Sequence, residues 1–397
     1  MGGKQMKSRE RVLKSLNHEE PDRFPRDLGG THYTSIHVDA HANLRHYLGL
    51  NGGQEKVFGF PSQSAVVDPR IKERWGIDFV TLPMNSPSAW KLNIETDDQG
   101  YKKYTDEWGV IRACPPGGFY YDIVSHPLAG ATLEDLDRYP WPDPLDPGRF
   151  AGLAERGREL YEGTDKCIVL GVDVALFQPT AALLGWEEFF RSLVGNQPLI
   201  RGFVERGLRF SEKLISAALD LVGKYVQVVV MSDDLTHQNG LFVRKQVIQD
   251  IFMPAYKKLI QLIKSKGDIK LFFHMCGASH LMFEELISAG VDAVNPVQVS
   301  AKGMDDTAAL KEKYGDRLTF WGGGCDTQQV LPFGTPEDVR KEARRRIADM
   351  APGGGFVFAA VHNIQRDVSP ENIMALYEEA INWGRYPIRA EDLRKNL

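Results

Sequence analysis

Short runs of consecutive apolar residues recur along the second half of this chain, and longer helix-patterned segments separate them. Continuous apolar strands that alternate with helices are typical of a parallel sheet covered by helices on both faces. Two earlier runs, near Phe24 and Phe79, extend the series. The six later runs lie at residues 167–172, 226–231, 269–273, 293–297, 318–321 and 356–361.

Eight strands with intervening helices predict an α/β fold of the (β/α)8 (TIM) barrel type. An open doubly wound sheet is the alternative. Residues 84–125 alternate between apolar and polar positions on either side of Asp97-Asp-Gln-Gly100, which predicts an antiparallel β-hairpin insertion. An apolar stripe predicts an N-terminal helical extension within residues 1–20. We expect residues 1–397 to form a single domain.

Composition narrows the range of partners. The chain of 397 residues carries a net charge of −5, which argues against nucleic acid as the main partner. No apolar run is long enough to span a membrane, and no export signal is visible, so we expect a cytoplasmic protein. Four cysteines are too few for a disulfide framework and are available as thiols.

Two residues at the end of one predicted strand suggest a metal site. His274 and Cys276 are separated by one residue, so their side chains point to the same side of the strand. Cys325 ends the next strand but one. An imidazole and two thiolates form a ligand set suited to zinc, and three protein ligands leave one position open for chemistry. The competing interpretation is a core histidine with two small buried cysteines.

Polar residues also follow the other predicted strands, where barrel enzymes carry their active sites. We expect proton transfer from Asp233, His237 or His362, and Asp326 is a candidate to orient a metal-bound histidine. The residues expected to bind substrate are Asp27, His32, Tyr33, Asp234, Gln298 and Asn363.

Several motifs resemble the uroporphyrinogen decarboxylase superfamily. One of the strongest is Phe273-His-Met-Cys-Gly277, and the resemblance extends over about residues 8–385. It implies the TIM barrel but is less specific for activity. The other matching segments are Ser8–Leu13, Glu20–Pro25, Gly290–Gln298, Leu331–Val339 and Pro370–Ile373.

The superfamily has two chemical branches. The metal-free decarboxylases hold substrate carboxylates with a motif resembling Arg-Gln-Ala-Gly-Arg, of which only Arg26 survives here. The zinc methyltransferases carry His-X-Cys-Xn-Cys, and His274 and Cys276 match its first two positions. In those enzymes the last cysteine lies where this chain has His362. The third ligand is therefore expected to be Cys325 or His362, or both residues bind, and Cys325 is the one we favour.

The resemblance thus implies a zinc-dependent methyltransferase of O-demethylation or related one-carbon metabolism. It would move a methyl group between a small methyl-bearing compound and a corrinoid protein. No Asp-X-His-X-X-Gly motif occurs in the sequence, so the corrinoid (cobalamin) is expected on a partner protein. The alternatives are a metal-free lyase of the decarboxylase type and a non-catalytic binding protein on the same barrel. The direction of transfer, and whether the chain forms a homodimer, stay open.

Overall fold

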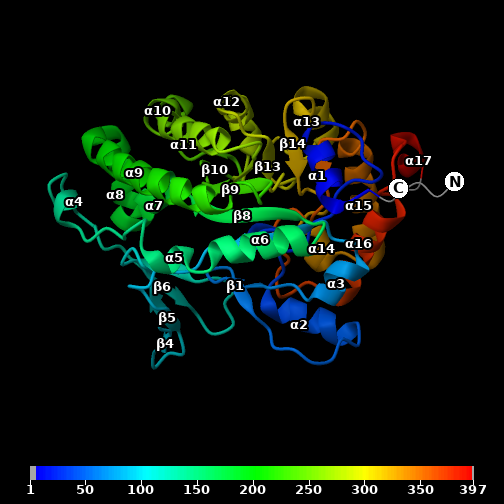
Figure 1. Cartoon of the computed structure of the whole chain (residues 1–397), viewed down its shortest axis with the longest axis horizontal. Helices are drawn as coiled ribbons and strands as arrows, with labels where there is room; N and C mark the ends of the chain where they lie inside the picture. Colours follow the sequence, from blue (N-terminus) through cyan, green and yellow to red (C-terminus); the bar gives the residue numbers. More distant parts are fainter. Residues whose placement is uncertain (1–5, 396–397) are drawn as a thin grey trace.

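The computed structural model describes residues 6–395 and contains the predicted parallel sheet. Seven strands run parallel in the order β15-β14-β13-β12-β9-β8-β3, curled with helices around them (Figure 1). Residues 1–5 of the predicted N-terminal extension lie outside the described part of the chain. The seven strands are β3 (Phe79–Pro83), β8 (Cys167–Val174), β9 (Val228–Ser232), β12 (Lys270–His274), β13 (Ala293–Asn295), β14 (Thr319–Trp321) and β15 (Phe356–Val357).

The segment Pro25–Asp27 closes the sheet into a barrel. On one side, the N–H of Asp27 donates to the carbonyl of Phe358 and the N–H of Phe358 donates to the carbonyl of Pro25. On the other side, the N–H of Asp78 donates to the carbonyl of Arg26. Pro25 has no N–H to donate, so this segment forms an isolated bridge and not a full strand. The (β/α)8 prediction, with its first strand near Phe24, is confirmed.

The barrel interior is filled by side chains from alternate strand positions. Val228 and Val230 point inward from β9, as do Cys167 and Val169 from β8, and Phe272 from β12. Helix α1 (Ser8–Leu16) closes one end of the barrel with two apolar side chains. Because side chains of a strand alternate between its two faces, the residue two positions beyond Phe272 also points inward, at the opposite end. That residue is His274.

The remaining helices surround the barrel. The longest is α9 (Gln197–Val222), which packs against α11 (Met253–Ser265) and α6 (Leu153–Gly163). Two 3-10 turns, η1 (His32–Thr34) and η2 (Ser279–Met282), follow strand ends. The other helices are α2 (Val38–Tyr47), α3 (Pro69–Arg74), α4 (Asp135–Arg138), α5 (Pro147–Phe150), α7 (Phe177–Leu184), α8 (Trp186–Gly195), α10 (Lys245–Ile251), α12 (Phe283–Ala289), α13 (Thr307–Tyr314), α14 (Val330–Phe333), α15 (Pro336–Met350), α16 (Pro370–Asn382) and α17 (Ala390–Arg394).

The predicted hairpin is part of a larger antiparallel insertion. A four-stranded sheet in the order β4-β5-β6-β7 projects from the barrel (Figure 1). The sequence pattern did not predict β7, the last strand of this sheet, because Pro115-Pro-Gly-Gly118 interrupts the alternation of apolar and polar residues before it. The insertion strands are β4 (Glu95–Thr96), β5 (Lys102–Thr105), β6 (Ile111–Cys114) and β7 (Asp122–Ser125). Two short ladders pair β1 (Val57–Gly59) with β2 (Ser64–Ala65) and β10 (Thr236–His237) with β11 (Gly240–Leu241).

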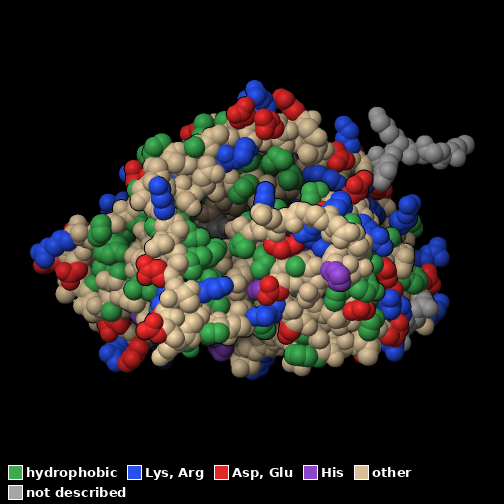
Figure 2. All heavy atoms as spheres, turned by 90° about the horizontal axis from the view of Figure 1, so that it is seen from below, with side chains coloured by type: hydrophobic (Ala, Val, Ile, Leu, Met, Phe, Trp, Pro, Cys, Tyr) green, Lys and Arg blue, Asp and Glu red, His purple; other side chains and the backbone are tan. Residues whose placement is uncertain are grey.

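The surface carries mixed charges. Seen from below the view of Figure 1, it is hollowed near the middle, and hydrophobic side chains gather beside the hollow (Figure 2). Across residues 6–395, no helix combines the length and apolar character that crossing a membrane requires.

Candidate metal site at the barrel mouth

His274 and Cys276 lie together where β12 ends. His274 is the last residue of the strand, and its ring is buried. The Sγ atom of Cys276 lies 3.3 Å from Nε2 of His274. The spacing of the two residues therefore brings imidazole and thiol into contact, as the sequence predicts.

His362 joins this pair from the far side of the barrel mouth. It follows β15, which is separated from β12 by two strands of the sheet. One ligand atom from each of His274, Cys276 and His362 lies within 4.8 Å of the other two. The rings of His274 and His362 have their centroids 5.2 Å apart. In the described part of the chain, this is the one group of three such side chains close enough to share a metal ion.

Cys325, predicted as the third ligand, lies outside this cluster. Its side chain is fully buried in the outer core, with Sγ 3.9 Å from the carbonyl oxygen of Asp326. Burial raises the pKa of its thiol well above the usual range, and Glu342 of α15 adds to the effect. Gly322 and Gly323 adopt φ of +110° and +75°, so the chain turns after β14 and the strand alternation no longer applies. Cys325 therefore faces the helices, and the prediction does not fit the geometry.

Both histidines are held in one orientation by amide side chains. Nδ1 of His274 lies 2.6 Å from Oδ1 of Asn295, and Nδ1 of His362 contacts Oδ1 of Asn363. An amide oxygen accepts hydrogen bonds, so each Nδ1 is the protonated nitrogen and each Nε2 is free to bind a metal. Burial lowers the pKa of His362 to about 4 and that of His274 well below its usual range. Both rings are neutral at pH 7, as ligation requires.

Asp234, predicted to bind substrate, lies beside the thiol. Its Oδ1 accepts the backbone N–H of Cys276 at 2.6 Å, and its Oδ2 accepts Nε2 of Gln178 at 2.9 Å. Burial raises the pKa of this carboxyl to about 6. Burial and the Asp234 carboxylate together raise the pKa of the Cys276 thiol. Asp234 therefore places a carboxylate in contact with Cys276, one of the candidate ligands.

The neighbouring Asp233 has a structural role and not the predicted role in proton transfer. Its carboxylate is fully buried and accepts the backbone N–H groups of Leu176, Phe177 and Gln178 at 2.6 to 2.9 Å. The hydroxyl of Tyr256 donates to it at 2.5 Å. These partners of the carboxylate belong to the start of α7 or to α11. Asp233 anchors helices, and its predicted catalytic role does not fit this placement.

His237 also lies outside the cluster. It is an exposed residue of the β10–β11 ladder, and its ring packs 5.2 Å from that of Phe242. Asp326, the proposed orienting group, uses Oδ1 to accept the backbone N–H of Gln328 at 2.8 Å. The histidines are oriented by asparagines instead.

Two predicted pocket residues reach the site as an aromatic stack. The ring of Tyr33 lies on that of His274, with centroids 3.7 Å apart and planes 13° apart. His32 packs on Tyr33 at 3.8 Å. Gln298 supports the loop after the ligands, because its Oε1 accepts the N–H of Gly277 at 2.8 Å. These residues line or brace the mouth.

Asp27 lies deeper in the barrel than predicted for a substrate contact. Its carboxylate is fully buried and accepts the indole N–H of Trp321 at 2.8 Å and the backbone N–H of Gly30 at 2.7 Å. Burial raises its pKa to about 6. Asp27 thus links the first strand to β14 through its hydrogen bond with Trp321.

Comparison with known proteins supports the family assignment. The profile of the family described as "Uroporphyrinogen decarboxylase (URO-D)" matches residues 123–383. This chain belongs to the uroporphyrinogen decarboxylase family. The solved structure of a "methyltransferase from Methanosarcina mazei" superposes with a TM-score of 0.64 at 16% identity, covering 95% of this chain and 99% of that one. At such low identity, this likeness shows the fold alone.

Uroporphyrinogen decarboxylases match shorter stretches of the chain. The protein from Psychromonas ingrahamii is 33% identical over 85 residues, which are 21% of this chain and 23% of that one. The protein from Ruthia magnifica subsp. Calyptogena magnifica is 25% identical over 174 residues, which are 42% of this chain and 46% of that one. The chain therefore matches less than half the length of these two relatives.

Arg26, the surviving arginine of the decarboxylase motif, does not face the mouth of this family member. It is buried, and its guanidinium packs against Gly76, where an added Cβ atom would lie 2.9 Å from Nη2. Burial and the nearby Arg23 lower its pKa to about 9. Arg26, the residue expected to hold a substrate carboxylate, therefore lies on the outside of the barrel.

Tyr120 is a residue of the site that the sequence did not reveal. Its ring is 38% exposed, but its hydroxyl accepts Nε2 of Gln365 at 2.7 Å and lies 3.4 Å from Oδ1 of Asn363. Burial raises its pKa to about 12. Asn363 is the residue that orients His362. The insertion of this uroporphyrinogen decarboxylase family member thus contacts the asparagine that orients His362. No local sequence motif predicts that contact.

Proposed function

We propose that this chain is a zinc-dependent methyltransferase. It would move a methyl group between a small methyl-bearing compound and a corrinoid carried by a separate protein. The observation that carries the proposal is the cluster of His274, Cys276 and His362 at the mouth of the barrel. In TIM barrels the residues at the carboxyl ends of the strands perform the chemistry.

The three side chains fit zinc by their chemistry. Two neutral imidazole nitrogens and one thiolate sulfur are ligands that zinc accepts, and catalytic zinc sites use three protein ligands. Each histidine has its Nδ1 occupied by an amide oxygen, which is the usual way to orient a ligating ring. His274 is buried, and Cys276 and His362 are half-buried, which limits the access of competing water.

The neighbouring residues supply the rest of the chemistry. When bound, zinc supplies a Lewis acid that lowers the pKa of a substrate thiol or hydroxyl, or polarises an ether oxygen. Asp234 contacts Cys276 and would take up the proton of its thiol if that residue bound the metal as a thiolate. Tyr33 covers one face of His274 and keeps water from it. The hydroxyl of Tyr120 is a proton donor at the edge of the site.

Transfer of a methyl group can be followed by the visible spectrum of the corrinoid. The purified protein would be mixed with a corrinoid protein in the cobalt(I) state and a panel of methyl donors. We expect conversion to methyl-cobalt(III) with the wild type and with Cys325→Ser, and loss of conversion with Cys276→Ser. No conversion across the panel, in protein that contains zinc, would contradict the proposal.

The curated relatives favour a second candidate, decarboxylation of uroporphyrinogen. This candidate needs a basic cleft for a substrate with many carboxylates. Arg26 lies against Gly76 on the outside of the barrel, and the mouth carries Asp234. Formation of coproporphyrinogen by the purified, metal-free protein would favour this activity over methyl transfer.

A further inference from the structure

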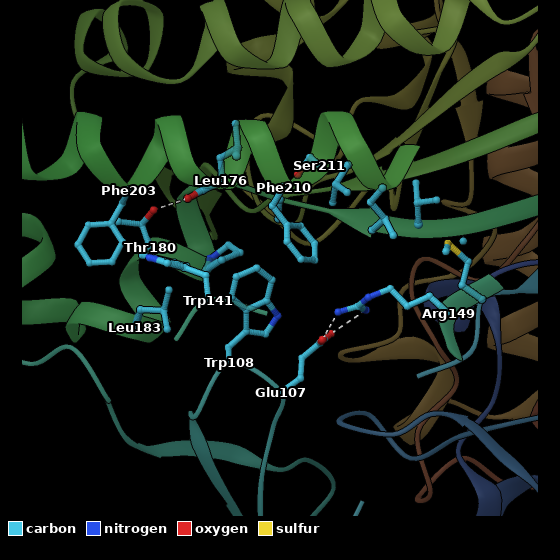
Figure 3. Close-up of a pocket in the computed structure, with 18 of the residues that line it drawn as sticks. Glu107, Trp108, Trp141, Arg149, Leu176, Thr180, Leu183, Phe203, Phe210 and Ser211 are labelled. Atoms are coloured by element: carbon cyan, nitrogen blue, oxygen red, sulfur yellow. Dashed lines mark hydrogen bonds and ion pairs between the residues drawn. The ribbon is translucent and has the colours of Figure 1, made fainter. Parts of the chain in front are cut away.

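A second cavity, of about 290 Å³, lies where the antiparallel insertion meets the barrel (Figure 3). Its walls come from the ends of β3 and β8, from α7 and α9, and from the turn between β5 and β6. His274, Cys276 and His362 do not line it. The predicted site residues do not line it either, so neither the sequence motifs nor the proposed reaction accounts for this space.

Aromatic side chains form one wall of this cavity. Phe203, Trp141, Trp108 and Phe210 follow one another edge to face, with centroids 6.1, 6.3 and 4.7 Å apart. Leu176 and Leu183 of the α7 region complete the apolar surface. A wall of this kind favours the face and edge of another aromatic ring over a flexible chain.

The polar groups at the other end are matched with one another. Both nitrogens of the Arg149 guanidinium tip contact the two carboxylate oxygens of Glu107, one of them at 3.2 Å, and Nε donates to the carbonyl of Asp143 at 3.0 Å. The hydroxyl of Thr180 donates to the carbonyl of Leu176 at 2.6 Å. The lining therefore has no net charge to offer, and a charged ligand would leave one member of the ion pair unmatched.

The indole N–H of Trp108 is a donor of the lining that has no partner among the described residues. In Figure 3 this nitrogen lies on the edge of the ring turned toward Glu107 and Arg149. An acceptor atom on a ligand in the cavity would satisfy this half-buried indole N–H.

The volume sets the size of that ligand. An engineered cavity of about 150 Å³ holds one benzene molecule. The cavity here is about twice as large, which suits one substituted ring and excludes a tetrapyrrole. We propose that it binds a single neutral aromatic ring with an oxygen substituent, of the phenol class, whose oxygen accepts the Trp108 N–H.

This site adjoins the barrel mouth. Met84 and Gly171 line both this cavity and a smaller one of about 120 Å³, whose wall includes His32. His32 packs on Tyr33, which in turn packs on His274. The ring is either part of the substrate or a separate effector, and binding itself does not depend on the metal or on the proposed reaction.

Binding of phenol and of toluene to the purified protein, measured by calorimetry, tests the proposal. We expect saturable binding of phenol with a Kd of about 1 mM, in metal-free protein as well as in zinc-loaded protein. Trp108→Phe keeps the ring but removes the N–H. This variant should lower the affinity for phenol by about 3- to 10-fold and change the affinity for toluene by no more than about twofold.

A blocking variant locates the ligand. Ser211 faces the cavity from α9, so Ser211→Phe should fill it and abolish binding of both compounds. Lys213→Phe adds the same ring at an exposed position of the same helix, and this variant should bind phenol and toluene as the wild type does. Absence of phenol binding to the wild type, or unchanged binding in a folded Ser211→Phe protein, would overturn the proposal. So would binding that is lost in His274→Ala, because the ring would then sit in the barrel mouth.

The spectral assay, which rests on the proposed function, separates the two roles of the ring, as part of the substrate or as an effector. A phenol that competes with the methyl-bearing compound in the spectral assay marks the cavity as the substrate's ring site. A phenol that binds without competing marks it as a separate effector site. Binding measured by calorimetry supports a ring-binding cavity whether or not methyl transfer is correct.

Discussion

Nδ1 of His274 lies 2.6 Å from Oδ1 of Asn295 at the mouth of the barrel. The amide of Asn295 is itself fixed, because its Nδ2 donates to the carbonyl of Trp321 at 2.8 Å. Its oxygen must therefore face the histidine, so the proton of the ring is on Nδ1. Nε2 is left free beside the sulfur of Cys276.

Removing this amide should weaken the metal site while the barrel stays folded. We expect Asn295→Ala to lower zinc affinity by about 10- to 100-fold, as loss of an orienting partner usually does. Competition against a colorimetric chelator measures the affinity. Asn372→Ala is the control, since it removes a buried amide that binds Leu331 far from the site. Equal losses in both variants would mean that the effect comes from general destabilisation.

Tyr120 should matter for turnover and not for metal binding. Tyr120→Phe removes the hydroxyl that contacts Gln365 and Asn363, and we expect kcat to fall by about 10-fold or more with zinc content unchanged. Because burial raises its pKa to about 12, the loss should be constant from pH 6 to pH 9. Tyr121→Phe serves as the control, because it changes a neighbouring ring of the insertion that packs on Phe60, between β1 and β2. A pure rise in KM, or loss of zinc, would argue for a structural role.

Asp27 should make stability depend on pH. Its folded pKa of about 6 lies above its ordinary value of 3.8 because burial disfavours the charged form. Its stabilising contribution is therefore full below pH 3.8 and is lost as the pH rises through 6. Lys72, which is buried nearby with a pKa of about 8, stays charged over that window.

Asp27→Asn removes this titration. The free energy of unfolding of the variant, relative to that of the wild type, should rise by about 2 kcal/mol between pH 4 and pH 7. Urea denaturation at several pH values measures the difference. A difference that is constant with pH would show that Asp27 does not titrate in this range.

The barrel could be predicted because its strands are buried on both faces. Runs such as Val228–Met231 are apolar at every position, and the two-residue spacing of His274 and Cys276 fixes their shared direction. The spacing argument failed at Cys325, because Gly322 and Gly323 turn the chain between strand and cysteine.

Contacts between distant segments could not be read from local patterns. Asp233 and Asp234 are neighbours in sequence, and only their partners show that one anchors α7 while the other contacts Cys276. Tyr120 is 243 residues from Asn363, and the contact depends on how the insertion folds back over the mouth.

The central claim is that His274, Cys276 and His362 bind one zinc ion. X-ray absorption at the zinc edge counts sulfur and nitrogen ligands directly, in the wild type and in Cys325→Ser. We predict one zinc per chain with one sulfur and two imidazole ligands, the same in both proteins. Two sulfur ligands in the wild type, falling to one in Cys325→Ser, would contradict the account, as would a purified protein that does not retain stoichiometric zinc.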